Sequence, residues 1–374
     1  MIPVFKPLIE DVDLESAAEA LSMGWLGMGS YVGAFERSLA GFLELSDDRH
    51  VVAVSTGHAA LHLALLAVGV GPGDEVVTPA FNNVADFQAI LACGATPVFC
   101  DIDDRTLCID IDAAGKLIGP RTRAIIVMDY GCFVCDHDRI AKIANGNGLR
   151  VIHDAAHSLG SRHDGRMVGS FSDVTMFSFD PVKTITTVDG GALILSHPET
   201  AKQVQEMRLI GMQQEPTTMY QNQRAWTQDV ARLGFRYHMA NLHAALGLAQ
   251  LGRFSEIATT RRNACVYYNE QLGSIPSLSV PDTSFGDVVP FLYYIRVPAG
   301  TREELRRHLH ERGVETGIHW QPGHWFTLFQ GCRKGDLAVT DRVGREIVTL
   351  PMHSKMSQDT QDVVIGAIWE FFGS

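Results

Sequence analysis

The chain has 374 residues, of which 46% are hydrophobic and 20% are charged, and its formal net charge at pH 7 is −12. This length allows a large core and a second, smaller domain, and the composition is that of an ordinary soluble enzyme. The negative charge argues against a nucleic-acid binder and against docking on anionic lipid. The longest apolar run is too short to span a bilayer and the N-terminus lacks the plan of a signal peptide, so we expect a cytoplasmic protein without membrane contact.

Segments typical of buried strands alternate with helical segments between residues 50 and 200. The predicted strands are 50–54, 75–78, 96–100, 124–128, 149–154, 174–179 and 192–196, and the helices between them are 59–68, 84–91 and 139–145. Several strands are apolar nearly throughout, as expected when both faces of a sheet are covered. The pattern predicts an α/β domain around a mainly parallel sheet, with ligands bound at the carboxyl ends of the strands.

The chain becomes polar and rich in glutamine over 212–234, which predicts a long loop that crosses the surface or reaches a neighbouring molecule. A helix through about Leu272 is expected to lead into a smaller α/β domain. That domain is predicted to hold a strand at 292–297, a helix opened by a capping box at 301–304 and a last helix at 358–372. We therefore expect a large domain over residues 1–250 and a small C-terminal domain over residues 251–374.

The cysteines form an odd set scattered through apolar segments: Cys93, Cys100, Cys108, Cys132, Cys135, Cys265 and Cys332. This distribution indicates reduced core thiols rather than a disulfide framework. Two spacings are typical of metal ligands, one between Cys132 and Cys135 ahead of His137, the other between His58 and His62. Neither has further ligands at a suitable spacing, so we expect no metal site.

Lys183 follows an apolar strand end and precedes threonines and a glycine pair within the segment 177–191. In such a setting a lysine can be partly desolvated and can act as a neutral nucleophile that forms a Schiff base with an aldehyde. Ser178, in the same segment, offers a hydroxyl to a phosphate, and Asp154 ends an upstream strand. Amine, hydroxyl and carboxylate are together what pyridoxal 5'-phosphate (PLP) requires of a protein.

A further phosphate-binding element follows the first predicted strand, where Gly57, His58 and Ala59 open a helix. Backbone N–H groups at a helix N-terminus form an anion site. Each feature taken singly also has an ordinary explanation: a strand-to-helix turn, an aspartate that caps a helix, or a solvated lysine. It is the combination and order of these features that predicts a cofactor site.

At these segments the chain resembles the sugar aminotransferases of the DegT/DnrJ/EryC1/StrS family, which are fold-type I PLP enzymes. The matching segments cover nearly the whole chain: 54–65, 78–85, 154–157, 177–191, 234–239, 318–324 and 350–353. The resemblance implies that the chain moves an amino group from glutamate or glutamine to a nucleotide-linked keto-deoxysugar through a Lys183 Schiff base. It also implies a homodimer with active sites at the subunit interface, acting in lipopolysaccharide O-antigen or natural-product glycan assembly.

The resemblance assigns catalysis to two residues: Lys183, which anchors the cofactor and moves protons, and Asp154, which supports the ring nitrogen. The residues that it implies for cofactor binding are Gly57, His58, Ala59, Asn83, Asp154, His157, Ser178, Lys183 and Arg236. The residues expected to enclose the sugar are Trp25, Met28, His319 and His324.

Four positions depart from the commonest residues of the family. His58 replaces a phosphate-binding threonine, and Asn83 replaces the aromatic residue that covers the pyridine ring. Arg236 replaces the asparagine with which a partner subunit meets the phosphate, and His238 replaces an arginine two residues later. We interpret Arg236 as a substitute phosphate ligand and His58 as a substitute cover for the ring.

Lys183 favours amino transfer over dehydration, because related sugar dehydratases replace this lysine. Two alternatives stay open: a catalytically altered or non-catalytic PLP-binding protein, and a PLP aminotransferase that acts on a cyclitol or an amino acid. The sequence does not decide the nucleotide, the position of the ketone or the stereochemistry of the new amine.

Overall fold

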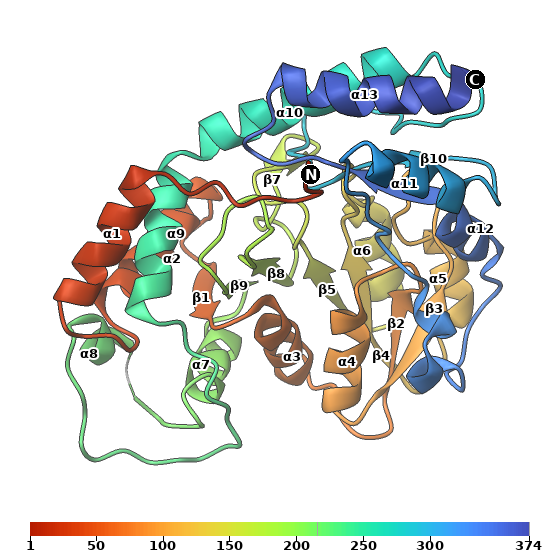
Figure 1. Ribbon diagram of the computed structural model, residues 1–374. Coiled ribbons are helices and arrows are strands. Elements are labelled where there is room, and N and C mark those ends of the chain that lie inside the picture. The colour runs from red at the N-terminus through yellow and green to blue at the C-terminus, as the bar shows by residue number, and fades with distance from the viewer. Residues whose placement is uncertain (215, 374) are drawn as a thin grey trace.

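A seven-stranded sheet forms the centre of the molecule in the computed structural model, which describes residues 1–214 and 216–373 (Figure 1). Its strand order is β1-β9-β8-β5-β4-β2-β3. The strands are β1 (His50–Val54), β2 (Glu75–Pro79), β3 (Thr96–Cys100), β4 (Thr122–Met128), β5 (Arg150–Asp154), β8 (Val174–Ser178) and β9 (Gly191–Leu195). All pairings are parallel except those of β9, which is antiparallel to β1 and to β8. The predicted strands and the α/β fold class are confirmed.

Helices cover both faces of the sheet, which explains why its strands are apolar nearly throughout. Neighbouring residues of β2 show this, because Val76 packs into a core with α3 (Gly57–Ala67) and α4 (Val84–Ala92), whereas Val77 packs into the core that includes α5 (Ile111–Leu117) and α6 (His137–Gly146). The helix α7 (Pro198–Met207) packs against β1, β9 and α3.

Helices from both halves of the chain pack together beside β1. They are α1 (Asp11–Ser22), α2 (Ser30–Phe42) and α9 (Asn241–Gly252), at the left of Figure 1. The helix that we expected to run to Leu272 is instead two helices, α9 and α10 (Phe254–Leu272), with Arg253 between them. The predicted loop over 212–234, of which residue 215 lies outside the described residues, projects below the sheet and contains a short helix, α8 (Pro216–Tyr220).

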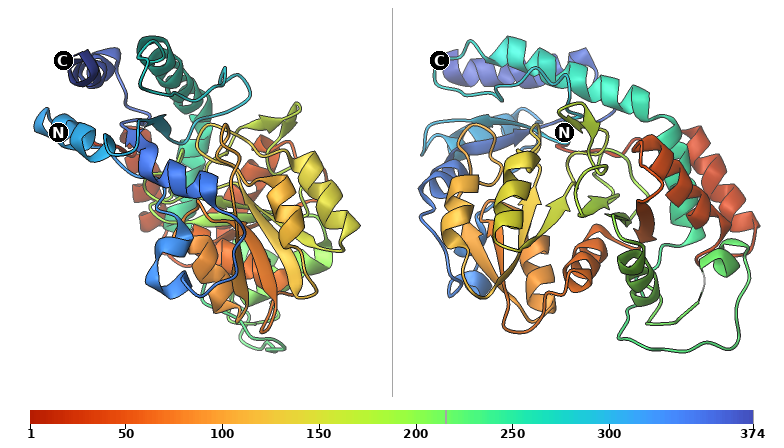
Figure 2. Two further views of the ribbon diagram at one scale, coloured as in Figure 1. Left: turned by 90° about the vertical axis from the view of Figure 1, so that its right-hand side faces the viewer. Right: turned by 180° about the vertical axis from the view of Figure 1, so that it is seen from behind.

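The C-terminal part carries a two-stranded antiparallel sheet, β10 (Tyr293–Arg296) with β11 (Ile347–Leu350). Its helices are α11 (Arg302–Glu311), α12 (Ala338–Glu346), α13 (Gln358–Gly373) and the 3-10 turns Gly323–Trp325 and Thr327–Phe329. The helices α10 and α13 lie side by side, as both views in Figure 2 show. The predicted capping box is wrong, because the side chain of Thr301 makes no capping hydrogen bond. The division at residues 250 and 251 stays a prediction.

A hairpin joins β6 (Arg162–His163) to β7 (Arg166–Met167). All seven cysteines are free and six of them are buried, as expected of core thiols. In the described part of the chain, no helix combines the length and the apolar character that crossing a membrane requires.

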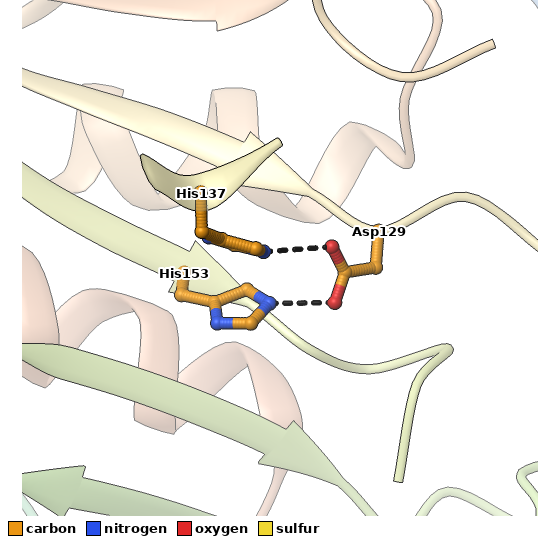
Figure 3. A group of neighbouring side chains, drawn as sticks. All are labelled: Asp129, His137 and His153. Atoms are coloured by element: carbon orange, nitrogen blue, oxygen red, sulfur yellow. Dashed lines mark hydrogen bonds and ion pairs between the residues drawn. The ribbon is translucent and has the colours of Figure 1, made fainter. Parts of the chain in front are cut away.

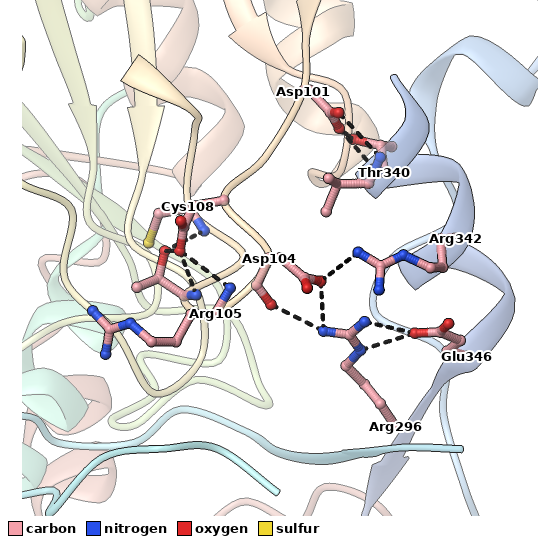
Figure 4. A network of polar contacts seen from close by, with 11 residues as sticks. Asp101, Asp104, Arg105, Cys108, Arg296, Thr340, Arg342 and Glu346 are labelled. Atoms are coloured by element: carbon pink, nitrogen blue, oxygen red, sulfur yellow. Dashed lines mark hydrogen bonds and ion pairs between the residues drawn. The ribbon is translucent and has the colours of Figure 1, made fainter. Parts of the chain in front are cut away.

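A polar network joins the C-terminal part to the loops that follow β3 (Figure 4). Arg296 on β10 contacts Glu346 at 2.6 Å and Asp104 at 2.8 Å. Asp101, just after β3, accepts hydrogen bonds from the N–H and the hydroxyl of Thr340, both at 2.7 Å. It also accepts the N–H of Val339 at 3.1 Å. Asp101 therefore caps the first turn of α12 from a different part of the fold.

Replacing Asp101 with Ala should destabilise the protein by about 2–3 kcal/mol, because buried donors at the start of α12 would lose their acceptor. Urea denaturation measures this as a lower midpoint with an unchanged slope. The matched control is Asp112→Ala, which removes an exposed ion pair with Arg139 and should leave the midpoint nearly unchanged. Equal midpoints for the two variants would contradict the capping role.

Candidate active site

A cavity of about 530 Å³ opens where β1, β5 and β8 end at their carboxyl edge. Parallel strands bring residues that are far apart in sequence to one edge of a sheet, which is where such folds bind ligands. The residues predicted from the sequence that line this cavity are Gly57, His58, Asn83, Asp154, His157, Ser178, Lys183 and His319.

Lys183 lies in the turn after β8, with its Nζ atom 4.2 Å from the centroid of the Phe291 ring. Burial lowers the pKa of this amine to about 8, although the carboxyl groups of Asp154, Asp180 and Asp86 act in the opposite direction. Desolvation disfavours the charged form, and the aromatic face and the carboxylates favour it. Lys183 can therefore supply a neutral amine near physiological pH.

Asp154 ends β5 and is 3% exposed. One of its carboxylate oxygens accepts the N–H of Ala156 at 2.9 Å. Burial raises the pKa of Asp154, and the hydrogen bond from Ala156 and the charge of Lys183 lower it in part. The carboxylate thus lines the same cavity as the amine, on a neighbouring strand.

Next to Asp154 is a buried group of polar side chains centred on Asp129, and Figure 3 shows Asp129 with His137 and His153. Asp129 accepts hydrogen bonds from His137 at 3.0 Å, His153 at 2.6 Å and Ser158 at 2.6 Å, and its own N–H donates to the carbonyl of Asp154 at 3.2 Å. Burial acts to raise the pKa of Asp129, but its interactions with His153 and His137 hold that pKa well below its usual range. These hydrogen bonds fix the end of β4 relative to the end of β5. His137 therefore bonds to Asp129 and does not form a cluster with Cys132 and Cys135, whose thiols donate to backbone carbonyls.

The start of α3 faces Ser178 across a narrow gap. A Cβ atom on Gly57 would lie 2.7 Å from the hydroxyl oxygen of Ser178, so only glycine allows this approach. Gly57 and His58 are the first helical residues, whose N–H groups no carbonyl of the helix can accept. The N–H of Ala59 is engaged, because it donates to the hydroxyl of Thr56 at 2.8 Å. Of the predicted anion-binding groups, the first two N–H groups and the hydroxyl of Ser178 are therefore the ones available to a ligand.

Two histidines of the cavity are held in the neutral form. His157 accepts the N–H of Gly131 through Nδ1 at 3.3 Å and stacks on Phe291 with ring centroids 4.2 Å apart. Burial and then the charge of Lys183 bring the pKa of His157 well below its ordinary value. The same two causes lower the pKa of His319 to about 4, and its Nδ1 lies 2.9 Å from the hydroxyl of Thr349.

The other predicted site residues lie elsewhere in the single chain. Trp25, Met28 and Arg236 line a second cavity of about 360 Å³. His324 lies in neither cavity and contacts Asp341 at 3.0 Å. Asn83 reaches the Lys183 cavity, but its side-chain oxygen accepts the N–H of Ala85 and caps α4.

Sequence reasoning missed several residues of the cavity: Phe5, Asp86, Asp180 and Phe291. Asp86 follows the N-cap Asn83 by three residues, where an acidic residue is ordinary helix-start chemistry. Phe5 and Phe291 come from remote parts of the chain, and no local pattern marks them. The position of Asp86 after the N-cap was the available sequence signal, but such an aspartate indicates the start of a helix as readily as a functional site.

The fold and this cavity define the class of protein, because the α/β arrangement matches fold-type I aminotransferase structures. TlmJ, an aminotransferase from Streptoalloteichus hindustanus, superimposes with a TM-score of 0.92 at 32% identity, over 100% of this chain and 99% of that one. Spr1654 from Streptococcus pneumoniae, in its PLP form, superimposes with a TM-score of 0.91 at 26% identity, over 100% and 98% of the two chains.

The chain belongs to the DegT/DnrJ/EryC1/StrS aminotransferase family, whose model matches residues 7–369. It is 35% identical to the spore coat polysaccharide biosynthesis protein SpsC of Bacillus subtilis, over 98% of this chain and 96% of that protein. It is 32% identical to the GDP-perosamine synthase of Caulobacter vibrioides, over 98% and 97% of the two. The family and the solved PLP form imply a PLP cofactor.

The reactivity of Lys183 in the cofactor-free protein should rise with a midpoint near pH 8, because its lowered pKa releases the nucleophilic amine there. Competitive acetylation at a series of pH values, with mass spectrometry of the peptide that carries Lys183, measures this midpoint. Free Nα-acetyl-lysine in the same solution is the reference, and its midpoint should fall at about 10.4. A shared midpoint would contradict the desolvated amine.

Proposed function

We propose that the protein is a PLP-dependent aminotransferase that moves an amino group from glutamate or glutamine to a nucleotide-linked keto-deoxysugar. The observation that carries this proposal is the shared cavity of Lys183 and Asp154, with the Lys183 amine at a pKa of about 8. The family and its sugar aminotransferases support amino transfer to a sugar. The nucleotide-linked acceptor is supported by the GDP-perosamine synthase among the relatives.

The residues of the cavity fit PLP in kind and in arrangement. The close approach of Gly57 to Ser178 places the first backbone N–H groups of α3 beside a hydroxyl, and these are donors that suit a phosphate. The Lys183 amine suits an aldehyde, and the Asp154 carboxylate suits a ring nitrogen that carries a proton. The cavity volume is also in the range of cofactor sites.

When bound, PLP would supply the aldehyde and the electron-withdrawing ring that amino transfer needs. Lys183 would hold the cofactor and then move a proton to and from the reacting carbon, a task suited to an amine with a pKa of about 8. The neutral His157 carries its proton on Nε2, because Nδ1 accepts the N–H of Gly131. The Phe291 ring contacts both Lys183 and His157, so it would help to exclude water from the amine.

The activity is tested by incubating the protein with PLP, ¹⁵N-labelled L-glutamate and a set of nucleotide-linked ketosugars. We expect a product with one ¹⁵N amine, detected by mass spectrometry, and no product from Lys183→Ala. Borohydride treatment before digestion should attach the cofactor to the peptide of Lys183 in the wild type alone.

The same assay separates the alternatives. Label transfer to free cyclitol ketones but to no nucleotide-linked sugar would replace the proposed acceptor. Cofactor attached to Lys183 without label transfer from glutamate or from amide-labelled glutamine would favour the non-catalytic PLP-binding protein. Lack of attached cofactor would contradict the proposed function as a whole.

Arg236 is the second residue whose role can be tested. It lies outside the Lys183 cavity of its own chain, so we propose that it reaches a cofactor phosphate in the second subunit of a homodimer. Arg236→Ala should weaken PLP retention by about tenfold or more, because an arginine–phosphate contact is a strong, charge-assisted one.

The matched control for Arg236→Ala is Arg224→Ala. Arg224 lines the same second cavity, and its guanidinium lies over the ring of Trp25, 5.3 Å from the centroid. Dialysis followed by absorbance gives the PLP content of both variants. Unchanged PLP content in Arg236→Ala, or an equal loss in Arg224→Ala, would contradict a specific phosphate contact by Arg236.

A further inference from the structure

The Lys183 cavity contains a second buried carboxyl group, Asp86, in the first turn of α4. Its side chain is fully buried and interacts directly with that of Asp154. The amide of Asn82 donates a hydrogen bond to Oδ2 of Asp86. No donor reaches the buried Oδ1 atom among the residues that the structure describes. An ionised Asp86 would thus have one oxygen without a donor and a second negative charge beside it.

We propose that Asp86 is a positioning residue that keeps its proton at neutral pH and donates it in a hydrogen bond to the carboxylate of Asp154. A protonated carboxyl has one hydroxyl to donate and one oxygen to accept, which matches an acceptor at Asp154 and a donor at Asn82. Because Oδ2 accepts from Asn82, the donated proton would be on Oδ1, and this buried atom would then have a partner instead of remaining unsatisfied.

The charges that face this pair favour one shared proton. Asp86 faces Asp154 and Lys183, and Asp154 also faces Asp129 from the neighbouring strand. Two ionised carboxylates would leave two negative charges beside the single amine of Lys183, whereas one proton leaves a balanced pair. Burial and the neighbouring Asp154 raise the pKa of Asp86 well above its ordinary value. The hydrogen bond from Asp86 in turn lowers the pKa of Asp154 and supports its ionised form.

The functional part of this inference rests on the proposed function. Asp154 presents its carboxylate to the cavity, and a hydrogen bond from Asp86 would fix the direction of that carboxylate. Asp86 would therefore act on cofactor binding through Asp154, without touching the reacting atoms. The protonation of Asp86 is a property of the protein alone and can be tested without any cofactor.

The first test is infrared spectroscopy of the cofactor-free protein at about pH 7. The difference between wild type and Asp86→Asn should show the carbonyl band of a protonated carboxylic acid in the wild type alone. The matched control is Asp180→Asn, because Asp180 lines the same cavity and accepts the N–H of Val182, and this variant should keep the band. Lack of the band in the wild type would overturn the proposal, whether or not the protein proves to be an aminotransferase.

The second test compares the pH dependence of Tm. Above about pH 4 an unfolded Asp86 releases its proton, whereas the folded chain keeps it, so wild-type stability should fall as pH rises toward the raised folded pKa. Asp86→Asn lacks this proton. The Tm of the variant minus that of the wild type should therefore increase between about pH 5 and about pH 8. A difference that is constant with pH would overturn the proposal.

The third test is rescue of cofactor affinity by the isosteric amide. Asn at position 86 can donate to Asp154 and accept from Asn82, so Asp86→Asn should keep the Kd for PLP within about threefold of the wild type. Asp86→Ala has no donor and should raise the Kd about tenfold or more. Equal Kd values for the Ala and Asn variants would overturn the positioning role. Lack of PLP binding by the wild type would instead refute the proposed function. The infrared result would then decide by itself whether Asp86 is protonated.

Discussion

The candidate active site depends on one constraint, which is that the Lys183 amine stays poorly solvated while carboxyl groups lie near it. The Nζ atom of Lys183 lies over Phe291, and its pKa of about 8 results from burial opposed by nearby carboxylates. Complete burial without those carboxylates would lower the pKa further, and full exposure would return it to that of an ordinary lysine. The amine is thus both available as a nucleophile and able to carry a proton.

The sheet explains how this balance is built. Parallel strands β4, β5 and β8 end side by side, so Asp129, Asp154 and Ser178 meet at one edge although they are far apart in sequence. The polar group around Asp129 holds the ends of β4 and β5, and the glycine at position 57 lets α3 approach Ser178. Remote segments then close the cavity with aromatic rings from Phe5, Phe291 and Trp320. Asp154, Ser178 and Gly57 lie at strand ends or at a helix start, where backbone position is well defined.

Much of the fold could be predicted because its signals are local. Apolar runs predicted the seven strands, and the order of Asp154, Ser178 and Lys183 along the chain indicated one cavity at the strand ends. Sequence signals failed where the outcome depends on three-dimensional context. Thr301 has the spacing of a capping box without the hydrogen bond, because spacing alone does not fix the backbone conformation before a helix. In the sequence, Asp86 has the features of an ordinary acidic residue in the first turn of a helix. Only the structure shows that it lies beside Asp154. The roles assigned to Trp25, Met28, Arg236 and His324 stay predictions, since these residues lie outside the Lys183 cavity of a single chain.

The most direct measurement of the central claim is the near-ultraviolet and visible absorbance of the PLP-loaded protein during titration with L-glutamate. If the Lys183 cavity carries out the donor half of an amino transfer, the visible band of the bound cofactor should fall as a near-ultraviolet band rises, with a clear isosbestic point. Added keto acid should reverse the change. A visible band that neither glutamate nor glutamine alters would contradict amino transfer from these donors, even with the cofactor in place.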